Sequence, residues 1–480
     1  MIDLFKHFHR EIVREKLFER IGRTRVFTAV RNVPLCMVEG IDMARLSLFG
    51  VGYLATLLVV STAHRCSLAD NWSQFRGPNA AGVSADSQLL LTWSETENLR
   101  WKVELPGPGS SSPIVHGDRV YITSYSGYGL PGDTEGDVNS LKRQLTCVDR
   151  LNGTLVWTTT VPGTAPEDLF QGYISEHGYA SNTPVTDGER VFCFFGKSGV
   201  VAFDLQGKQL WKTKVGSESS IRRWGSGASL ILYKNLLIVN AAEESQSLRA
   251  LDQTTGEEVW KVESAALELA YGTPGLVELN DGRTDLVMAL PGESWGLNPE
   301  TGLTRWRIEH ELTGTICPSI ISDKETIFIF GGFRSAGSLA LKLNAEEEDA
   351  APELLWTSRI SSYVATPLLF EGHLYWIDDR GHAFCISAST GELVYRERVS
   401  EFEAGGRPVY ASPVLAAGKI YVQSRWAGML ILAAKPEYEL LAQNRFTTDE
   451  SDFNATPAIV AGELFVRSNR YLYCVNGQHK

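Results

Sequence analysis

The sequence is short of positive charge, and this shortage excludes one class of partner. Its 480 residues contain 45 Lys and Arg against 57 Asp and Glu, which gives a net charge of −12. Residues 1–69 hold 10 of the basic and 6 of the acidic residues, so the rest of the chain carries −16. A body of that charge repels phosphate backbones, and we expect no nucleic-acid partner.

Cysteine is also scarce, and histidine is dispersed. Five of the seven cysteines lie beyond the N-terminal segment, at Cys147, Cys193, Cys317, Cys385 and Cys474. No Cys-x-x-Cys-His haem motif occurs, and the histidines of the body are scattered rather than set at metal-ligand spacing. We therefore expect neither a disulfide framework nor a metal site, and no residue stands out as catalytic.

Long apolar runs are missing as well. The stretch Leu46–Val60 has 15 residues, which is short of the roughly 20 that a membrane span needs. It lies between Arg45 and the small residues before position 70, so it predicts an export signal over 43–69, with an N-terminal anchor as the alternative. Residues 1–42 fit no normal leader, so either translation starts at Met43 or these residues form a short cytoplasmic tail. Arg65 argues against lipidation of Cys66, and we expect a soluble periplasmic or secreted protein.

A step of the Ser/Thr-Pro type recurs along the rest of the chain and opens an apolar run each time. The second residues of these steps lie 71, 46, 44, 44, 49, 46 and 44 positions apart. The eight steps are Ser112-Pro113, Thr183-Pro184, Ser229-Leu230, Thr273-Pro274, Cys317-Pro318, Thr366-Pro367, Ser412-Pro413 and Thr456-Pro457. A period in the forties indicates radially repeated four-stranded sheets. We therefore predict an all-β fold, an eight-bladed β-propeller of antiparallel blades over 98–480, after a lead-in segment over 70–97.

The last repeat, 455–475, supplies only three strands. The strand predicted at 99–105 can complete it, which would close the ring and remove exposed sheet edges. Each typical repeat also contains a tight turn followed by Trp, as in Thr255-Gly256 and Trp260. We expect these Trp rings to lie between neighbouring blades. Cys147, Cys385 and Cys474 take the place of Ala250 and are expected to be small core residues.

The pattern Ala250-x-Asp252-x-x-Thr255-Gly256-x-x-x-Trp260 resembles the tryptophan-docking, pyrroloquinoline-quinone (PQQ) type repeat of quinoprotein alcohol dehydrogenases and BamB-type proteins. The resemblance covers about residues 98–476. It implies an exported binding or scaffold module for a protein or small ligand in envelope assembly, or alternatively a PQQ- and calcium-dependent alcohol or sugar dehydrogenase. The adjacent cysteine pair typical of the dehydrogenases is absent from the sequence, so no cofactor is expected.

Propellers bind ligands at the mouths of the central channel, near the start of each innermost strand. Five repeats carry an aromatic residue just before this point: Tyr179, Tyr271, Tyr363, Tyr410 and Phe453. Such a collar is either packing around the neck or a contact surface. Polar clusters add the candidate ligand-binding residues Glu176, His177, Arg223, Trp224, Arg425 and Trp426. Arg beside Trp is common at recognition sites, so we expect a protein or peptide partner for a monomeric chain.

Overall fold

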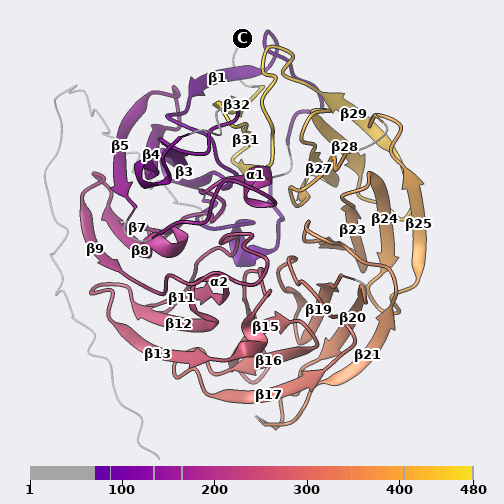
Figure 1. The fold of residues 1–480 in the computed structure, drawn as a ribbon. Helices are drawn as coiled ribbons and strands as arrows, with labels where there is room; N and C mark the ends of the chain where they lie inside the picture. Colours follow the sequence, from indigo (N-terminus) through magenta and orange to yellow (C-terminus); the bar gives the residue numbers. More distant parts are fainter. Residues whose placement is uncertain are drawn as a thin grey trace, which may run out of the picture. The chain divides into compact units, whose positions relative to one another are not determined.

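The computed structural model describes residues 71–86, 88–132, 136–163, 166–333, 335–347, 349–403 and 406–477. The predicted extension over 1–42 and the export signal over 43–69 lie outside the described residues. Within the described part, the strands form eight four-stranded antiparallel sheets arranged around a centre (Figure 1). This confirms the predicted eight-bladed propeller. No helix among these residues is long and apolar enough to cross a membrane.

The first four blades follow chain order, each from the innermost strand outward. Blade 1 consists of β2 (Ile114–His116), β3 (Arg119–Ser126), β4 (Lys142–Asp149) and β5 (Leu155–Pro162). Blade 2 consists of β6 (Val185–Thr186), β7 (Arg190–Phe194), β8 (Val200–Asp204) and β9 (Gln209–Thr213). Blade 3 consists of β10 (Ile231–Tyr233), β11 (Leu236–Ala241), β12 (Ser247–Asp252) and β13 (Glu258–Glu263). Blade 4 consists of β14 (Gly275–Glu278), β15 (Thr284–Leu290), β16 (Glu293–Leu297) and β17 (Thr304–Glu309).

The remaining blades continue the same order until the ring closes. Blade 5 consists of β18 (Ile321–Asp323), β19 (Thr326–Gly331), β20 (Gly337–Lys342) and β21 (Glu353–Ser358). Blade 6 consists of β22 (Leu368–Phe370), β23 (His373–Ile377), β24 (His382–Ser387) and β25 (Leu393–Arg398). Blade 7 consists of β26 (Val414–Ala416), β27 (Lys419–Gln423), β28 (Met429–Ala433) and β29 (Leu440–Asn444). Blade 8 consists of β30 (Ala458–Val460), β31 (Glu463–Arg467), β32 (Tyr471–Val475) and, as its outer strand, β1 (Leu99–Glu104).

The predicted Trp residues join neighbouring blades. Each Trp lies on an outer strand opposite a small residue of the third strand, as Trp157 does with Cys147 and Trp260 with Ala250. The register shifts at these pairs, and such bulges increase the local twist. The indole N–H donates to a carbonyl of the next blade in five cases: Trp101 to Arg150, Trp157 to Leu205, Trp211 to Gln253, Trp260 to Pro299 and Trp356 to Ala388.

Trp306 is an exception among the docked rings. Its indole N–H donates to Asp285 Oδ2 of its own blade, at 2.9 Å. The next blade joins β20 to β21 through the longer connection 343–352 instead of a tight turn with glycine. The usual carbonyl acceptor is therefore not offered to Trp306 at this junction.

Blade 8 closes the ring as predicted. β1 pairs with β32 in antiparallel register, with Trp101 opposite Cys474. The junction with blade 1 also contains a nearly buried ion pair, in which Arg150 Nε lies 2.6 Å from Glu463 Oε2. Arg100 pairs with the other oxygen of the same carboxylate. The first and last strands of the propeller are thus held by both backbone and charged contacts.

Candidate ligand-binding site at the mouth of the channel

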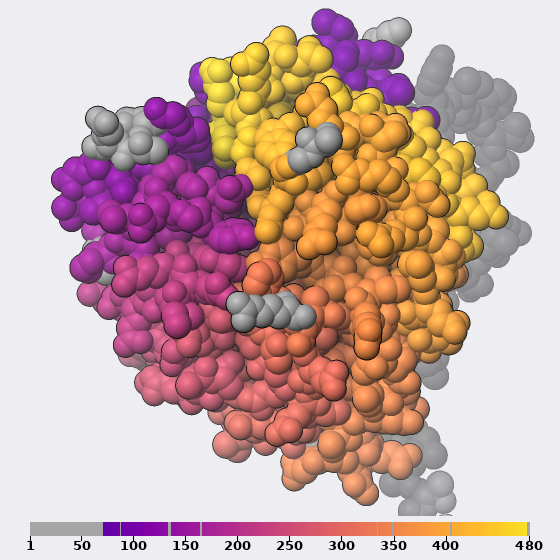
Figure 2. Space-filling view, turned by 45° about the vertical axis from the view of Figure 1, so that its right-hand side comes forward, coloured from indigo at the N-terminus to yellow at the C-terminus, as the bar shows by residue number. Residues whose placement is uncertain are grey.

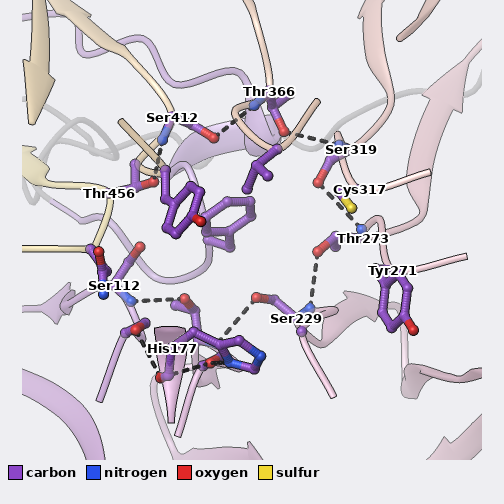
Figure 3. A pocket seen from close by; sticks show the side chains of 18 of the residues that line it. Ser112, His177, Ser229, Tyr271, Thr273, Cys317, Ser319, Thr366, Ser412 and Thr456 are labelled. Carbon is purple, nitrogen blue, oxygen red and sulfur yellow. Dashed lines mark hydrogen bonds between the residues drawn. The ribbon is translucent and has the colours of Figure 1, made fainter. Parts of the chain in front are cut away.

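A ring of hydroxyl groups surrounds the neck of the channel. Each blade has one Ser or Thr two residues before its innermost strand, and the backbone N–H of seven of these residues donates to the hydroxyl of the next at 2.9–3.3 Å. Seven such bonds join the eight members in order (Figure 3). We call this set the hydroxyl ring: Ser112, Thr183, Ser229, Thr273, Ser319, Thr366, Ser412 and Thr456.

The predicted opening of blade 5 was wrong by two residues. Cys317-Pro318 has the Ser/Thr-Pro pattern with cysteine in place of the hydroxyl residue, but the ring bonds pass through Ser319. Cys317 lies above the ring in the wall of the cavity. With Ser319 in place, the separations around blade 5 become 46 and 47 residues, close to those of the other blades.

The predicted lead-in segment closes one end of the channel. Trp72 pairs with Val115 of β2, and Val83 forms a parallel bridge with Leu415 of β26, so the segment runs from blade 1 to blade 7. In Figure 1 this indigo part of the chain lies across the centre of the ring. A cavity, described below, lies at the other end of the channel, and Phe75 lines the bottom of this cavity.

Arg76 anchors this segment inside the channel. Its side chain is buried, and its five N–H groups donate to five backbone carbonyls: Ala80, Ala81, Thr366, Pro367 and Pro413. Burial lowers the pKa of Arg76 to about 9. No carboxylate of the described residues pairs with this guanidinium, so its charge is not compensated locally.

Above the hydroxyl ring lies a cavity of about 200 Å³ with an aromatic wall. The aromatic residues of the wall are Tyr173, Trp224, Tyr271, Tyr363 and Tyr410, with Phe75 below. Trp224 stacks on Tyr271 with ring centroids 5.4 Å apart and contacts Tyr173 at 4.3 Å. The rings above Phe75 come from connections that precede five different blades, so only the closed propeller brings them together.

The short helix α1 (Ile174–His177) lies over this mouth and is fixed by polar contacts to several blades. Glu176 Oε2 is 2.7 Å from Arg425 Nη1, and Arg425 Nη2 is 2.7 Å from Asp452 Oδ2. The carbonyl of Glu176 accepts a hydrogen bond from Asn454, at 2.9 Å. These contacts tie the connection between blades 1 and 2 to blades 7 and 8 across the channel.

His177 lines the cavity, but both of its ring nitrogens are occupied. Nδ1 bonds with the Ser181 hydroxyl and Nε2 with the Trp224 carbonyl, at 2.7 Å for the latter. Burial lowers the pKa of His177, so the neutral ring is favoured. With no free nitrogen, His177 joins two connections and is not placed to act as a base.

A pair of buried carboxyl groups lies behind the aromatic wall. Glu243 Oε2 accepts from the Tyr271 hydroxyl at 3.2 Å, and burial raises the pKa of Glu243. Burial and the neighbouring Glu243 raise the pKa of Glu244 to about 8. The Oε2 atom of Glu244 has no hydrogen-bond partner among the described residues. Burial and the neighbouring Glu243 therefore favour the protonated form of Glu244.

The predicted site residues fall into three groups. Tyr271, Tyr363, Tyr410, Glu176, His177 and Trp224 line the cavity. Arg425 and Trp426 line an adjoining hollow beside blade 7. Tyr179 instead packs among Tyr125, Tyr128 and Phe170, Phe453 packs against Phe446 and Tyr473, and Arg223 is exposed on the connection 214–230. Whether any of these residues binds a ligand stays a prediction.

Several residues at or beside the cavity were not among the predicted site residues. The ring hydroxyls were part of the repeated step, which is a recognisable signal, and Phe75 and Arg76 lie in the predicted lead-in segment. Tyr173 of the wall and Arg407 of the adjoining hollow had no such signal. Arg407 lies over the rings of Tyr173 and Tyr363, with its guanidinium carbon 5.6 and 5.2 Å from their centroids.

The fold and the cavity together define a PQQ-type propeller with a ligand-sized hollow at one mouth. A family model described as outer membrane protein assembly factor BamB matches residues 141–394, and the chain belongs to this family. The tetrathionate hydrolase of Acidithiobacillus ferrooxidans is 22% identical over 405 residues, which cover 76% of this chain and 74% of that protein.

Two solved structures share the architecture. BamB from Moraxella catarrhalis has a TM-score of 0.57 and 12% identity, covering 80% of this chain and 98% of that one. The quinohemoprotein alcohol dehydrogenase from Comamonas testosteroni has a TM-score of 0.50 and 11% identity, covering 86% of this chain and 81% of that one. At such identities the likeness shows the fold alone.

Proposed function

We propose that this chain is a binding module of the cell envelope that holds an extended segment of a partner protein across the mouth of its channel. The observation that carries the proposal is the continuity of three hollows on this face. The central cavity shares Tyr173, Glu176 and Tyr410 with a hollow of about 510 Å³ beside blade 7. It shares Glu176, His177 and Asn454 with a hollow of about 620 Å³ between blades 8 and 1. A continuous groove of this kind suits an extended chain better than a compact ligand.

The chemistry of the groove fits a polypeptide. Trp426 is 51% exposed at one end, and its indole N–H donates to Asp452, so the ring is held in place before a partner arrives. Near the centre, Phe333 is 43% exposed and contacts Tyr363. Exposed aromatic rings beside arginine are typical of binding hot spots. Figure 2 shows the magenta segments of the early blades beside the orange segments of blade 7 on this face.

The family and the sequence both support an envelope location for the proposed function. The family model names an outer-membrane assembly factor, and the apolar stretch Leu46–Val60 predicts export. We therefore place the chain in the envelope, as a secreted or periplasmic protein. Its partner would be an exported protein with an extended, aromatic-rich segment, because the groove offers aromatic surfaces and paired charges along its length.

Fluorescence anisotropy with the full chain tests this proposal. The probe is a fluorescein-labelled nine-residue peptide with aromatic residues at alternate positions and an amidated C-terminus. We expect saturable binding that Trp426→Ala weakens about tenfold or more, as for an exposed aromatic hot spot. The control is Leu303→Ala, because Leu303 is 69% exposed but does not line any of the three hollows. Absence of saturable binding, or equal weakening by both variants, would refute the groove.

A further inference from the structure

The hydroxyl ring retains unused hydrogen-bond donors. Seven of its oxygens accept a backbone N–H, which leaves the hydroxyl hydrogen of each free to be donated. Within the described part of the chain, none of these hydroxyls donates a hydrogen bond to another residue. All eight members line the cavity. The neck therefore presents a circle of O–H donors to whatever occupies the cavity.

A buried positive charge lies directly beside this ring. Two of the Arg76 nitrogens donate to the carbonyls of Thr366 and Pro367, at 2.9 and 3.0 Å, and Thr366 is itself a ring member. All five donors of Arg76 are used, so its guanidinium does not reach into the cavity. Its charge still acts there, since a buried charge is screened weakly.

The other polar groups of the wall do not oppose a negative ligand. Among the described residues, Glu176 is the one carboxylate that lines the wall, and it is paired with Arg425 at 2.7 Å. His177 has both nitrogens engaged. Burial raises the pKa of the Cys317 thiol to about 12, so this side chain is neutral. The neck of the cavity thus carries hydroxyl donors, and the positive charge of Arg76, which no carboxylate pairs with, lies beside it.

We propose that the neck of the channel is a binding site for an oxyanion, which accepts hydrogen bonds from the hydroxyl ring and is stabilised by the charge of Arg76. At about 30 Å³ for each water, the cavity of about 200 Å³ holds roughly six waters, enough for a tetrahedral oxyanion with a small organic part. The oxyanion has two possible sources with the same chemistry. One is a free dianion, and the other is the terminal carboxylate of a polypeptide lying in the groove.

Isothermal titration calorimetry of the full chain in a low-chloride buffer tests the site. The probes are sodium sulfate, and the nine-residue groove peptide with either a free or an amidated C-terminus. The principal variant is Ser112→Ala, because the Ser112 hydroxyl accepts none of the seven ring bonds and its loss leaves no backbone N–H unpaired. Two further variants are compared with each other: Thr273→Val, which removes the hydroxyl donor, and Thr273→Ser, which keeps it.

The matched control is Thr146→Val, the same change at a buried β4 residue that bonds Thr158 and does not line the cavity. A hydrogen bond to a charged group is worth enough that losing it weakens binding about tenfold or more. We expect this loss for Ser112→Ala and Thr273→Val, near-native binding for Thr273→Ser, and no change for Thr146→Val.

Each outcome bears on the proposal. If sulfate binds and the variants weaken its binding as expected, the site takes free dianions. If the peptide with a free C-terminus binds more tightly than the amidated peptide, and the variants remove this preference, the site takes the terminal carboxylate. No binding of sulfate and no preference for the free C-terminus would overturn the site, as would equal effects of Ser112→Ala and Thr146→Val. The amidated peptide separates this site from the groove, since its binding depends on Trp426 and not on the ring.

Discussion

The buried carboxyl group of Glu244 makes the stability of the propeller depend on pH, and Glu244→Gln should remove that dependence. The pKa of Glu244 is raised from an ordinary value of 4.5 to about 8, first by burial and then by Glu243. Between these values the folded protein binds one proton more than the unfolded chain. The stabilisation that the Glu244 carboxyl group contributes is therefore fully present below pH 4.5, and it is lost as the pH rises toward 8.

The size of the loss in the free energy of unfolding follows from the shift in the pKa of Glu244. Each pKa unit corresponds to about 1.4 kcal/mol, so a shift of about 3.5 units amounts to roughly 5 kcal/mol over the whole window. About half of this loss falls between pH 5 and pH 7. The neutral amide of the Gln variant does not ionise, so its free energy of unfolding should not follow this slope.

Urea denaturation of the full-length protein and the variant, repeated from pH 5 to pH 8, measures the difference. The free energy of unfolding of the variant should rise relative to the parent by about 1.4 kcal/mol for each pH unit up to about 8. Glu257→Gln is the control, because Glu257 is exposed on a turn and its replacement should leave the two curves parallel. Parallel curves for Glu244→Gln as well would refute the account of this buried acid.

Three further predictions concern the fold and the site. Gly256→Ala should lower the free energy of unfolding by about 1–3 kcal/mol more than Gly372→Ala. Both glycines have nearly equal positive φ (74° and 75°), but only a Cβ at Gly256 meets Trp211, at 2.5 Å. Equal losses of stability in chemical denaturation would argue against tight docking of the Trp211 ring. Glu463→Gln should destabilise the closing junction by roughly 3 kcal/mol or more, since two arginines lose their buried partner, and a thermal melt like that of the parent would contradict this. Absorbance titration with PQQ and calcium should show no stoichiometric complex, because the carboxylate in the cavity wall is already paired with Arg425; tight binding would revive the dehydrogenase alternative.

The lead-in segment changes how the channel is understood. A propeller channel open at both ends would be a pore, but Phe75 and Arg76 close one end and leave a cavity at the other. Gly77 allows this path, because its φ is 66° and a Cβ there would lie 2.4 Å from the Trp72 ring. The segment is thus part of the site, although it precedes the first blade in the sequence.

The repeat by itself determined the fold. The period in the forties, the turn before Trp and the small residue opposite Trp are local patterns, and each recurs because every blade solves the same packing problem between two neighbours. The closing strand at 99–104 could be predicted because the last repeat lacked one strand. Cys147, Cys385 and Cys474 were predictable as small residues for the same reason, and each lies opposite an aromatic ring.

The site was decided by tertiary structure. Its wall combines rings from the irregular connections before several blades, and their direction depends on contacts between parts far apart in the chain, such as the pairing of Glu176 with Arg425. Tyr179 and Phe453 occupy sequence positions like that of Tyr271 but turn into apolar clusters. The sequence pattern of the repeated step occurs at Cys317, two residues before the residue that takes part in the ring. The pattern alone does not show which hydroxyl accepts the ring hydrogen bond. A period fixes what all blades share, whereas the differences between blades, which make the site, exist only once the ring has closed.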